Sequence, residues 1–454
     1  MRLSRHDLAG TLRSLVDGPV LTPGDAGYDH ARTPFFAHRV GRPAAVVRPR
    51  HAADVATTVR VAAGSDTPLF VRGGGHTAHS TGDGLLLDLG GLTEVRLDPG
   101  GGTAWAGGGH TAGGLTRELG AHGLAVGFGD TGSTGIGGLT LGGGVGFLSR
   151  LHGLTVDNLV GAEVVTADGS VRGVDAGHDP DLFWAIRGGG GNVGVVTRFG
   201  YRTARVGEVY GGLLVLPATP RVVAGLVAAC REAGRGLSVV ADVMPAPPLP
   251  SVPAELHGRL VVLTRVCVAG PGDAEAAVRP LRGLATPLAD RLGPLPYAAL
   301  LDHEAPDRGM RPAIRTMFLD RVDESAAATV LDHLERGRSP LRLVQVRVLG
   351  GAVDDVGPDD TAYAHRGAAV LLTVVHGDQP DQAWAARWAD DVVAGLDQGA
   401  GGAYVNFLGP GDTGRVTAAY PPRTLARLRR IKTAHDPDNV FRHNVNITPE
   451  GAGT

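Results

Sequence analysis

Dense clusters of glycine constrain this chain more than any other feature of its sequence. The chain has 454 residues, of which 71 are glycine, against a usual share of roughly 7%. The glycines follow no three-residue period, which excludes a collagen-like fold. Many of them interrupt ordinary apolar strands, above all at 73–75, 127–146 and 188–191. Because glycine has no Cβ, such clusters indicate backbone that packs closely against a ligand.

Consecutive glycines also let backbone N–H groups converge on an anion, and such a nest of donors suits a pyrophosphate. The tract 135–146 has the composition for this, but it contains no P-loop, and Lys432 is the only lysine of the chain. A GxGxxG pattern is uninformative in sequence so rich in glycine, and no acidic residue stands at the offset a Rossmann unit needs. The spacing alone favours a ligand with phosphates, with flexible loops as the alternative.

Strands and helices alternate over a short space in the first 205 residues. Helices are expected up to Gly64, over 115–126 and from Asp179 onward, and the Asp168-Gly169 pair predicts a hairpin turn. Strands are expected at 44–47, 68–71, 85–89, 160–167, 171–174 and 193–199.

The character of the sequence changes near residue 205, where the glycine clusters stop. Strands at 212–216, 260–268 and 341–349 then alternate with helices at 221–232, 272–282 and 324–335. This pattern predicts an α+β unit on an antiparallel sheet. Glycines return past residue 400, and a helix at 422–433 closes the chain. We therefore expect residues 1–205 and 400–454 to form one unit, with 206–399 inserted.

Charge and composition exclude several classes of function. The net charge is -3, which argues against a broad surface for nucleic acid or anionic membranes. No apolar run approaches the roughly 18 residues that span a bilayer, and the first residues lack the pattern of a signal peptide. We expect a cytoplasmic protein whose oligomeric state is open. Cys230 and Cys267 form no CxxC pair, and no metal-ligand spacing is present, so no metal is predicted.

Several separate motifs carry a resemblance to a known family. They are Arg72-Gly-Gly-Gly-His76, GSTGIGGLTLGGGVGFLSRLHGLTVDNL (132–159), VVTADG (164–169), DLFWAIRGGGGNVGVVTRF (181–199), Tyr404-Val-Asn406 and IKTAHDPDNVFRHNVNITP (431–449). Together, and in this order, they resemble the FAD-binding oxidases of the vanillyl-alcohol oxidase superfamily, with the berberine-bridge-enzyme-like branch as the best match.

The resemblance implies an α+β fold with two units. Residues 1–205 and 400–454 would form a discontinuous, two-subdomain FAD-binding domain of the PCMH type. Residues 206–399 would form a substrate-binding domain whose antiparallel sheet, covered by helices, lies over the isoalloxazine face.

The resemblance also implies how FAD is held. The family bonds the histidine equivalent to His76 covalently to the 8α carbon of FAD. Many members add a cysteine link four residues before the GxGG motif, but this chain has Thr131 there, so we predict a bond through His76 only. Thr134 and Gly135 would lie beside the flavin ring. The predicted cofactor-binding residues are Arg72, Gly73, Gly74, Gly75, His76, Thr77, Thr131, Ser133, Thr134, Gly135, Gly137, Gly138, Gly142, Gly143, Gly144, Gly146, Asn192, Val195, Tyr404, Asn406 and Asn444.

Three residues are the catalytic candidates: Tyr404, Gln345 and Asn444. Tyr404 stands in the Tyr-x-Asn position, where family members use a tyrosinate as base, which requires the phenol pKa to be shifted down. Gln345 aligns with a catalytic glutamate of some relatives and cannot itself be a base. Strand alternation puts Gln345 and Arg347 on one face, which is either the substrate face or a solvated one.

Other polar residues are weaker candidates. His110 repeats the hexapeptide of His76 without the preceding arginine, and we expect it to be structural. His365, Arg366 and His376 are further candidates for the site.

The leading hypothesis is an FAD-dependent oxidase acting on a small organic substrate. Hydride would pass to flavin N5 and O₂ would be the acceptor, giving H₂O₂. The apolar insert and an arginine-rich composition typical of a GC-rich bacterial genome favour a secondary-metabolite substrate, as in antibiotic biosynthesis. The alternatives are an oxygenating flavoenzyme, a carbohydrate oxidase, and a flavoprotein that sequesters a drug for self-resistance, which the absence of a glutamate at position 345 would suit.

Overall fold

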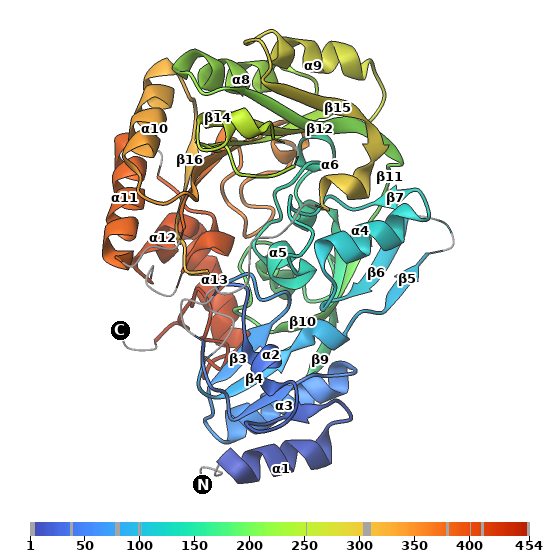
Figure 1. Cartoon of the computed structure of the whole chain (residues 1–454). Helices are drawn as coiled ribbons and strands as arrows, with labels where there is room; N and C mark the ends of the chain where they lie inside the picture. Colours follow the sequence, from blue (N-terminus) through green and yellow to red (C-terminus); the bar gives the residue numbers. More distant parts are fainter. Residues whose placement is uncertain are drawn as a thin grey trace.

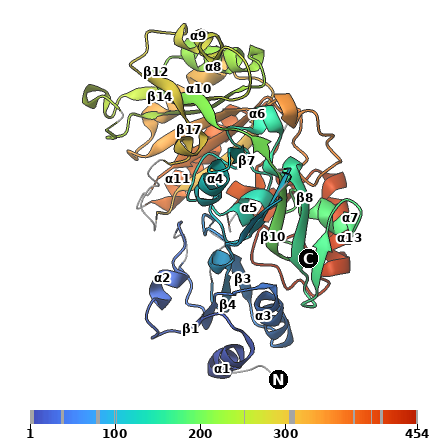
Figure 2. The same cartoon turned by 90° about the vertical axis from the view of Figure 1, so that its right-hand side faces the viewer.

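The computed structural model places three larger sheets and one strand pair around a central cavity. It describes residues 5–36, 40–77, 82–98, 100, 102–250, 252–302, 310–377, 381–399, 401–409 and 413–451. The N-terminal sheet and its helices lie at one end of the molecule, and the largest sheet with its helices lies at the other (Figures 1 and 2). No helix in the described part of the chain is long and apolar enough to cross a membrane.

The N-terminal sheet has four strands in the order β1-β2-β4-β3, with β2, β4 and β3 parallel and β1 antiparallel to β2. Leu12 of α1, Val59 of α3 and Leu85 of β4 are fully buried in its core. The elements are β1 (Val20–Leu21), β2 (Ala45–Val47), β3 (Leu69–Arg72), β4 (Leu85–Asp88), α1 (Arg5–Leu15), α2 (Tyr28–Arg32) and α3 (Ala52–Gly64). The strands β2, β3 and β4 and the helix end at Gly64 match the sequence-based expectation to within about one residue, whereas β1 was not predicted.

The second sheet is antiparallel and has five strands in the order β5-β6-β10-β8-β9. Its strands are β5 (Val95–Leu97), β6 (Thr103–Gly107), β8 (Leu159–Val165), β9 (Val171–Val174) and β10 (Val195–Arg202). Around it lie α4 (Ala112–Gly120), α5 (Ile136–Leu141), α7 (Pro180–Ala185), α12 (Val416–Ala419), α13 (Pro422–His435) and the pair β7 (Leu124–Ala125) with β11 (Ala204–Arg205). The short helix α6 (Ser149–His152) lies against the seven-stranded sheet instead. Leu428 and Ile431 of α13 share one core with Leu182 of α7 and Phe199 of β10. The C-terminal helix is thus packed against N-terminal elements.

The helix expected over 115–126 is wrong at both ends. The helix α4 begins earlier, because the Thr111 hydroxyl accepts a hydrogen bond from the Gly114 N–H at 3.2 Å and caps it. It ends at Gly120, and the chain then enters the short strand β7. The glycine tract 127–146 contains the helix α5, which the sequence pattern did not predict.

The third sheet is antiparallel and has seven strands in the order β15-β12-β14-β13-β17-β18-β16. Its strands are β12 (Glu208–Pro217), β13 (Leu237–Pro245), β14 (Leu260–Val268), β15 (Ala289–Pro296), β16 (Ala313–Leu319), β17 (Arg342–Val348) and β18 (Val370–His376). Four helices pack on one face: α8 (Pro220–Glu232), α9 (Ala274–Arg282), α10 (Glu324–Arg336) and α11 (Gln382–Gly395). Their apolar side chains form one core with alternate residues of the strands.

Candidate functional site

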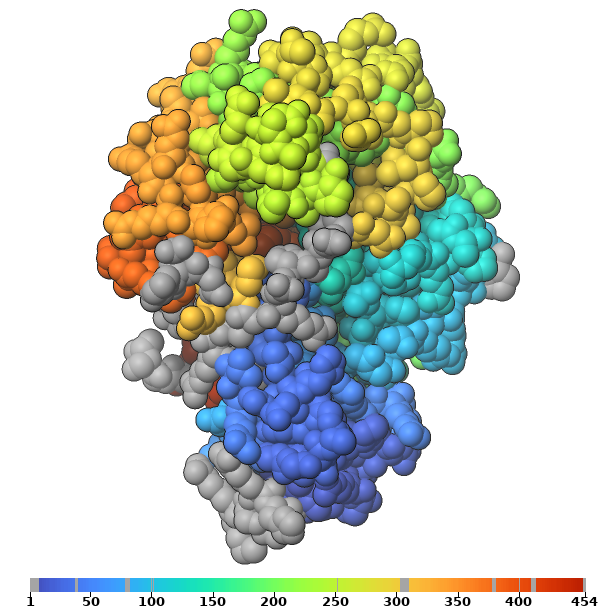
Figure 3. Space-filling model, viewed as in Figure 1, coloured from blue at the N-terminus to red at the C-terminus, as the bar shows by residue number. Residues whose placement is uncertain are grey.

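A large cavity lies between the glycine-rich loops and the face of the seven-stranded sheet opposite the helices α8, α9, α10 and α11. Its volume is about 1660 Å³, larger than the roughly 300–1,000 Å³ typical of small-ligand pockets. The space-filling view is seen from the side of Figure 1, with the blue N-terminal part below and the green to orange sheet region above (Figure 3). The predicted residues that line the cavity are Arg72, Gly73, Gly74, Gly75, His76, Thr77, Thr131, Thr134, Gly135, Gly137, Gly138, Asn192, Val195, Gln345, Tyr404, Asn406 and Asn444.

Five predicted cofactor-binding residues are not part of this wall: Ser133, Gly142, Gly143, Gly144 and Gly146. For the four glycines the reason is close packing within the protein. A Cβ at Gly142 would lie 2.1 Å from Asn406 Oδ1, and one at Gly146 would lie 1.9 Å from the Phe128 carbonyl oxygen. Side chains and backbone of the chain itself approach these positions closely enough to require glycine.

Two glycine segments cross at the cavity wall. A Cβ at Gly74 would lie 2.2 Å from the Gly135 nitrogen, and a Cβ at Gly135 would lie 2.1 Å from the Gly74 nitrogen. Both positions therefore require glycine whatever the ligand is. The crossing brings the His76 motif against the 132–146 tract, two segments that the sequence pattern singled out separately.

The His76 ring is held by aromatic neighbours at the cavity wall. It stacks on Phe35 with ring centroids 4.1 Å apart and an interplanar angle of 13°, and it meets the edge of Phe36 at 6.4 Å. The Phe35 N–H donates to the Gly75 carbonyl at 2.9 Å, so backbone contacts keep the stacking ring next to the motif. The imidazole is thereby oriented beside the cavity.

Arg72 is the buried cation of the same motif. Its Nη2 contacts Asp88 Oδ2 at 2.9 Å and also donates to the Ala31 carbonyl. Its Nη1 is buried and has no hydrogen-bond partner in the described part of the chain. The guanidinium is therefore only partly satisfied by the protein around it.

Three residues of the C-terminal segment also line the cavity with buried polar atoms that have no hydrogen-bond partner among the described residues. These atoms are His443 Nε2, Asn444 Oδ1 and Asn446 Oδ1. His443 also stacks on Phe70, with centroids 4.3 Å apart. Buried polar atoms are rarely left unpaired, because desolvation without a hydrogen bond costs about 1–3 kcal/mol each. Together with Arg72, these groups suit a ligand with many polar atoms, such as a dinucleotide cofactor.

Lys432 and Asn192 tie this segment to the second glycine cluster. The Lys432 ammonium is fully buried and donates to Asp436 Oδ2 at 2.6 Å, to the Asn192 carbonyl at 2.8 Å and to the Phe441 carbonyl at 3.0 Å. The Asn192 amide accepts from the Ile447 N–H at 2.9 Å. Burial lowers the pKa of Lys432, and Asp436 opposes this. Lys432, His443 and Asn446 were not predicted from the sequence as site residues. For Lys432, its being the only lysine of the chain could have pointed to a special role.

Tyr404 is buried, and its hydroxyl oxygen accepts two hydrogen bonds. The donors are the Gly144 N–H at 2.9 Å and Asn406 Nδ2 at 3.0 Å. Burial raises the pKa of Tyr404, while these two hydrogen bonds and the Arg347 charge oppose the rise. The two donors are placed to stabilise a phenolate oxygen when the proton leaves.

The predicted alternation of the 341–349 strand is confirmed in β17. Val344, Val346 and Val348 lie in the core under the helices, whereas Gln345 and Arg347 line the cavity. Of the two outcomes that the alternation left open, the polar pair therefore faces the cavity.

The weaker histidine and arginine candidates do not line this cavity. His365 stacks on Phe318 at 4.3 Å, and Arg366 pairs with Asp157 at 2.6 Å. His376 is fully buried against Trp384 and Trp388, with ring centroids 5.1 and 4.9 Å away. His110 is buried as well, and like the other three residues it is not part of the cavity wall. Their contacts are structural.

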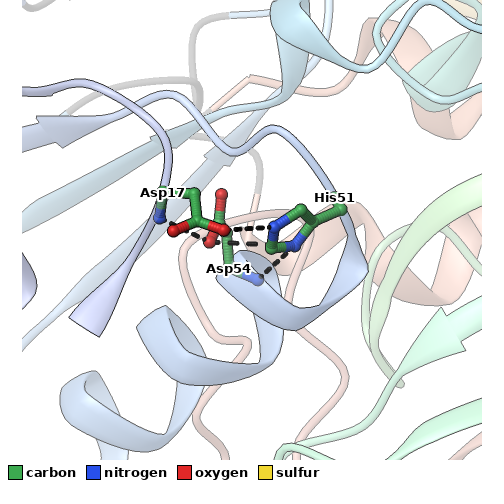
Figure 4. A group of neighbouring side chains, drawn as sticks. All are labelled: Asp17, His51 and Asp54. Carbon is green, nitrogen blue, oxygen red and sulfur yellow. Dashed lines mark hydrogen bonds and ion pairs between the residues drawn. The ribbon is translucent and has the colours of Figure 1, made fainter.

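In the described part of the chain, the side chains of Asp17, His51 and Asp54 form a cluster whose potential metal-ligand atoms lie within 4.8 Å of one another (Figure 4). Hydrogen bonds explain this cluster without a metal ion, because His51 is the N-cap residue of α3. His51 Nδ1 accepts from the Asp54 N–H at 3.3 Å, and its Nε2 lies 2.9 Å from Asp17 Oδ2. Asp54 accepts from the backbone N–H groups of residues 17, 18 and 50.

The fold and the cavity define a mixed α/β protein with a large, partly polar cavity between a glycine-rich unit and an antiparallel sheet. Comparison with known proteins agrees. Residues 43–175 match the family described as FAD binding domain, and residues 403–448 match the family described as berberine and berberine like.

Similar proteins extend over almost the whole chain. (R)-6-hydroxynicotine oxidase of Paenarthrobacter nicotinovorans is 31% identical over 458 residues, which cover 96% of this chain and 98% of that protein. The crystal structure of 6-hydroxy-D-nicotine oxidase from Arthrobacter nicotinovorans has a TM-score of 0.84 at 28% identity, covering 96% of this chain and 98% of that one. Glucooligosaccharide oxidase from Acremonium strictum, with a 6-S-cysteinyl, 8α-N1-histidyl FAD, has a TM-score of 0.84 at 24% identity, covering 97% of this chain and 99% of that one.

The chain belongs to the vanillyl-alcohol oxidase superfamily of PCMH-type flavoproteins, in its berberine-bridge-enzyme-like branch. It is an FAD-dependent oxidoreductase. The fold class expected from the resemblance is confirmed. The unpaired polar atoms of Arg72, His443, Asn444 and Asn446 and the crossing of Gly74 and Gly135 fit this cofactor.

Proposed function

We propose that this protein is an oxidase that carries FAD covalently through His76 and oxidises a small organic substrate. The observation that carries the proposal is the convergence of His76, Thr134, Tyr404 and Gln345 on one cavity, although they come from distant parts of the chain. When bound, FAD accepts a hydride at N5 and passes the electrons to O₂, which yields H₂O₂.

The covalent link is proposed through one residue only. In glucooligosaccharide oxidase from Acremonium strictum, the flavin is linked to both a cysteine and a histidine. Here Thr131 lines the cavity where the motif spacing predicts the cysteine, and a threonine hydroxyl does not form a thioether. Cys230 and Cys267 are buried in the region of the seven-stranded sheet. The stacked geometry of His76 on Phe35 supports the single histidyl link.

The cofactor would be held by groups that otherwise lack partners. Arg72, His443, Asn444 and Asn446 supply the unpaired polar atoms, and the glycines at 73–75, 135, 137 and 138 line the wall without side chains. The shared core of α13 with α7 and β10 supports a discontinuous FAD-binding unit of residues 1–205 and 400–454. Residues 206–399 would form the substrate-binding unit.

Tyr404 is the proposed base. Its oxygen receives hydrogen bonds from Gly144 and Asn406, which would stabilise the phenolate, the form of Tyr404 that can accept a proton from the substrate. Burial favours the protonated phenol, whereas these two hydrogen bonds and the Arg347 charge favour the phenolate. Gln345 has no acid–base function and would position the substrate. The Asn444 side-chain amide donates to the Gly191 carbonyl at 2.9 Å. Its Oδ1 would orient the bound cofactor.

The test of the proposed activity is a redox titration with candidate substrates. Under anaerobic conditions a substrate should bleach the flavin absorbance, and on admission of air it should yield one H₂O₂ per substrate oxidised. Incorporation of labelled oxygen from O₂ into the product would contradict an oxidase in favour of an oxygenating enzyme. Tight binding without bleaching, across all bound compounds, would contradict catalysis in favour of a sequestering flavoprotein.

A further inference from the structure

The cavity-facing side of the seven-stranded sheet carries two rows of side chains. The register of β16, β18 and β17 aligns Ile314 with Val375 and Val375 with Leu343. All three line the cavity and form an apolar row across three strands. The neighbouring row places Thr373 beside Gln345. Because alternate residues of a strand share a face, both rows point to the same side of the sheet.

The charged groups beside these rows are paired with one another. Arg347 Nη2 and Nε lie 2.9 and 3.2 Å from Asp130 Oδ2. Arg265 lies 3.5 Å from Asp242 Oδ2 and 3.7 Å from Asp130 Oδ2. Two guanidinium groups thus face two carboxylates, all four of them largely buried. The cluster adds no net charge to this end of the cavity, so a charged ligand would meet no excess of opposite charge here.

Gln345 offers a hydrogen-bond acceptor at the cavity. Its Nε2 donates to Asp242 Oδ1 at 2.6 Å, and this contact sets the orientation of the amide. Its Oε1 accepts no hydrogen bond from any described residue. The half-buried amide therefore presents a carbonyl oxygen, which is an acceptor, next to the apolar row.

We infer that the substrate is an uncharged, mainly apolar molecule that carries one hydroxyl or N–H donor near the carbon to be oxidised. Its apolar part packs on Ile314, Val375 and Leu343, and its donor bonds to Gln345 Oε1. This inference rests on the proposed function, because it concerns the substrate of the same site.

The same geometry disfavours other substrate classes that this family of folds contains. An oligosaccharide would place several hydroxyls against the apolar row, where each loses its hydrogen bonds to water and gains none. A carboxylate or an ammonium ion would be desolvated beside a cluster that is already neutral. Selectivity thus comes from the Gln345 acceptor beside the apolar row of Ile314, Val375 and Leu343.

Five probes of known structure test the inference on the purified holoprotein: phenol, anisole, benzoate, benzylamine and cellobiose. Their dissociation constants are measured by calorimetry, which needs no flavin signal, and the flavin content is read separately from the visible spectrum. We expect phenol to bind at least tenfold more tightly than benzoate, benzylamine or cellobiose. Anisole lacks the donor and should bind about fivefold more weakly than phenol, the effect of one neutral hydrogen bond.

Two matched variants assign the effect to the amide. Gln345→Leu should bring the ratio of anisole to phenol dissociation constants to about one, because the acceptor is lost. Gln382→Leu removes an equivalent amide that lines the cavity from α11 and should leave the ratio unchanged.

The outcomes separate the two proposals. Tighter binding of benzoate, benzylamine or cellobiose than of phenol overturns the inference, as does an unchanged ratio in Gln345→Leu. Protein that binds no flavin contradicts the proposed function instead.

Discussion

Phe35 offers a direct way to perturb the proposed covalent link without touching His76. The two rings stack at 4.1 Å and 13°, and stacked aromatic pairs contribute about 0.5–1.5 kcal/mol beyond their buried area. At 1.4 kcal/mol per factor of ten, this is about a 2- to 12-fold shift in the population of the stacked imidazole. Phe35→Leu should slow flavin attachment by about that factor, since leucine keeps apolar bulk but not the stacked ring.

The assay is a time course of flavin attachment. Protein produced without flavin is mixed with FAD, quenched at intervals in acid and run on a denaturing gel, where the covalent flavin fluoresces. Phe36→Leu is the matched control, because Phe36 meets the His76 ring only by its edge at 6.4 Å. A Phe35→Leu protein that attaches FAD at the wild-type rate would refute the reasoning, and so would an equal slowing in Phe36→Leu.

Three further predictions concern the remaining elements of the site and fold. Lys432→Met should lower the free energy of unfolding by about 3–5 kcal/mol, because it leaves Asp436 as a buried charge without its partner; urea unfolding should show that adding Asp436→Asn recovers part of this loss. Tyr404→Phe should lower kcat by a factor of about 10²–10⁴ while the amount of acid-stable flavin stays unchanged. Equal rate constants for flavin reduction in wild type and variant, measured by stopped flow, would exclude Tyr404 as the base. The hydrogen bond to Asp17 raises the pKa of His51. The interaction of the two side chains therefore stabilises the fold below about pH 6.5, and this contribution is lost as pH rises through the raised pKa. Asp17→Asn should lower the melting temperature more at about pH 6 than at about pH 8, and an equal decrease at both pH values would contradict this prediction.

Local patterns of the sequence predicted much of the fold. Alternation in the 341–349 strand predicted which side chains of β17 share a face, because period two follows from strand geometry alone. The β14 strand was predicted with its observed bounds, Leu260–Val268. The α4 helix was misplaced because its start depends on the Thr111 cap, a local contact that the apolar pattern does not reveal.

Site residues that belong to a sequence motif were predicted. Features of the site that depend on contacts between distant parts of the chain were missed. The glycines 142–146 share the composition of the lining glycines, but Asn406 and Phe128 are what approach Gly142 and Gly146. Arg347 and Asp130 are 217 residues apart in sequence, and nothing local links them. His443 and Asn446 matter through buried atoms without partners, which only the folded chain reveals.

The most direct test of the central claim is the visible spectrum of acid-precipitated protein, wild type beside His76→Ala. Covalent attachment of FAD through His76 predicts a yellow wild-type pellet with a colourless supernatant, and a His76→Ala pellet that retains no flavin. Yellow colour in the wild-type supernatant, or in the His76→Ala pellet, would contradict attachment of FAD through His76.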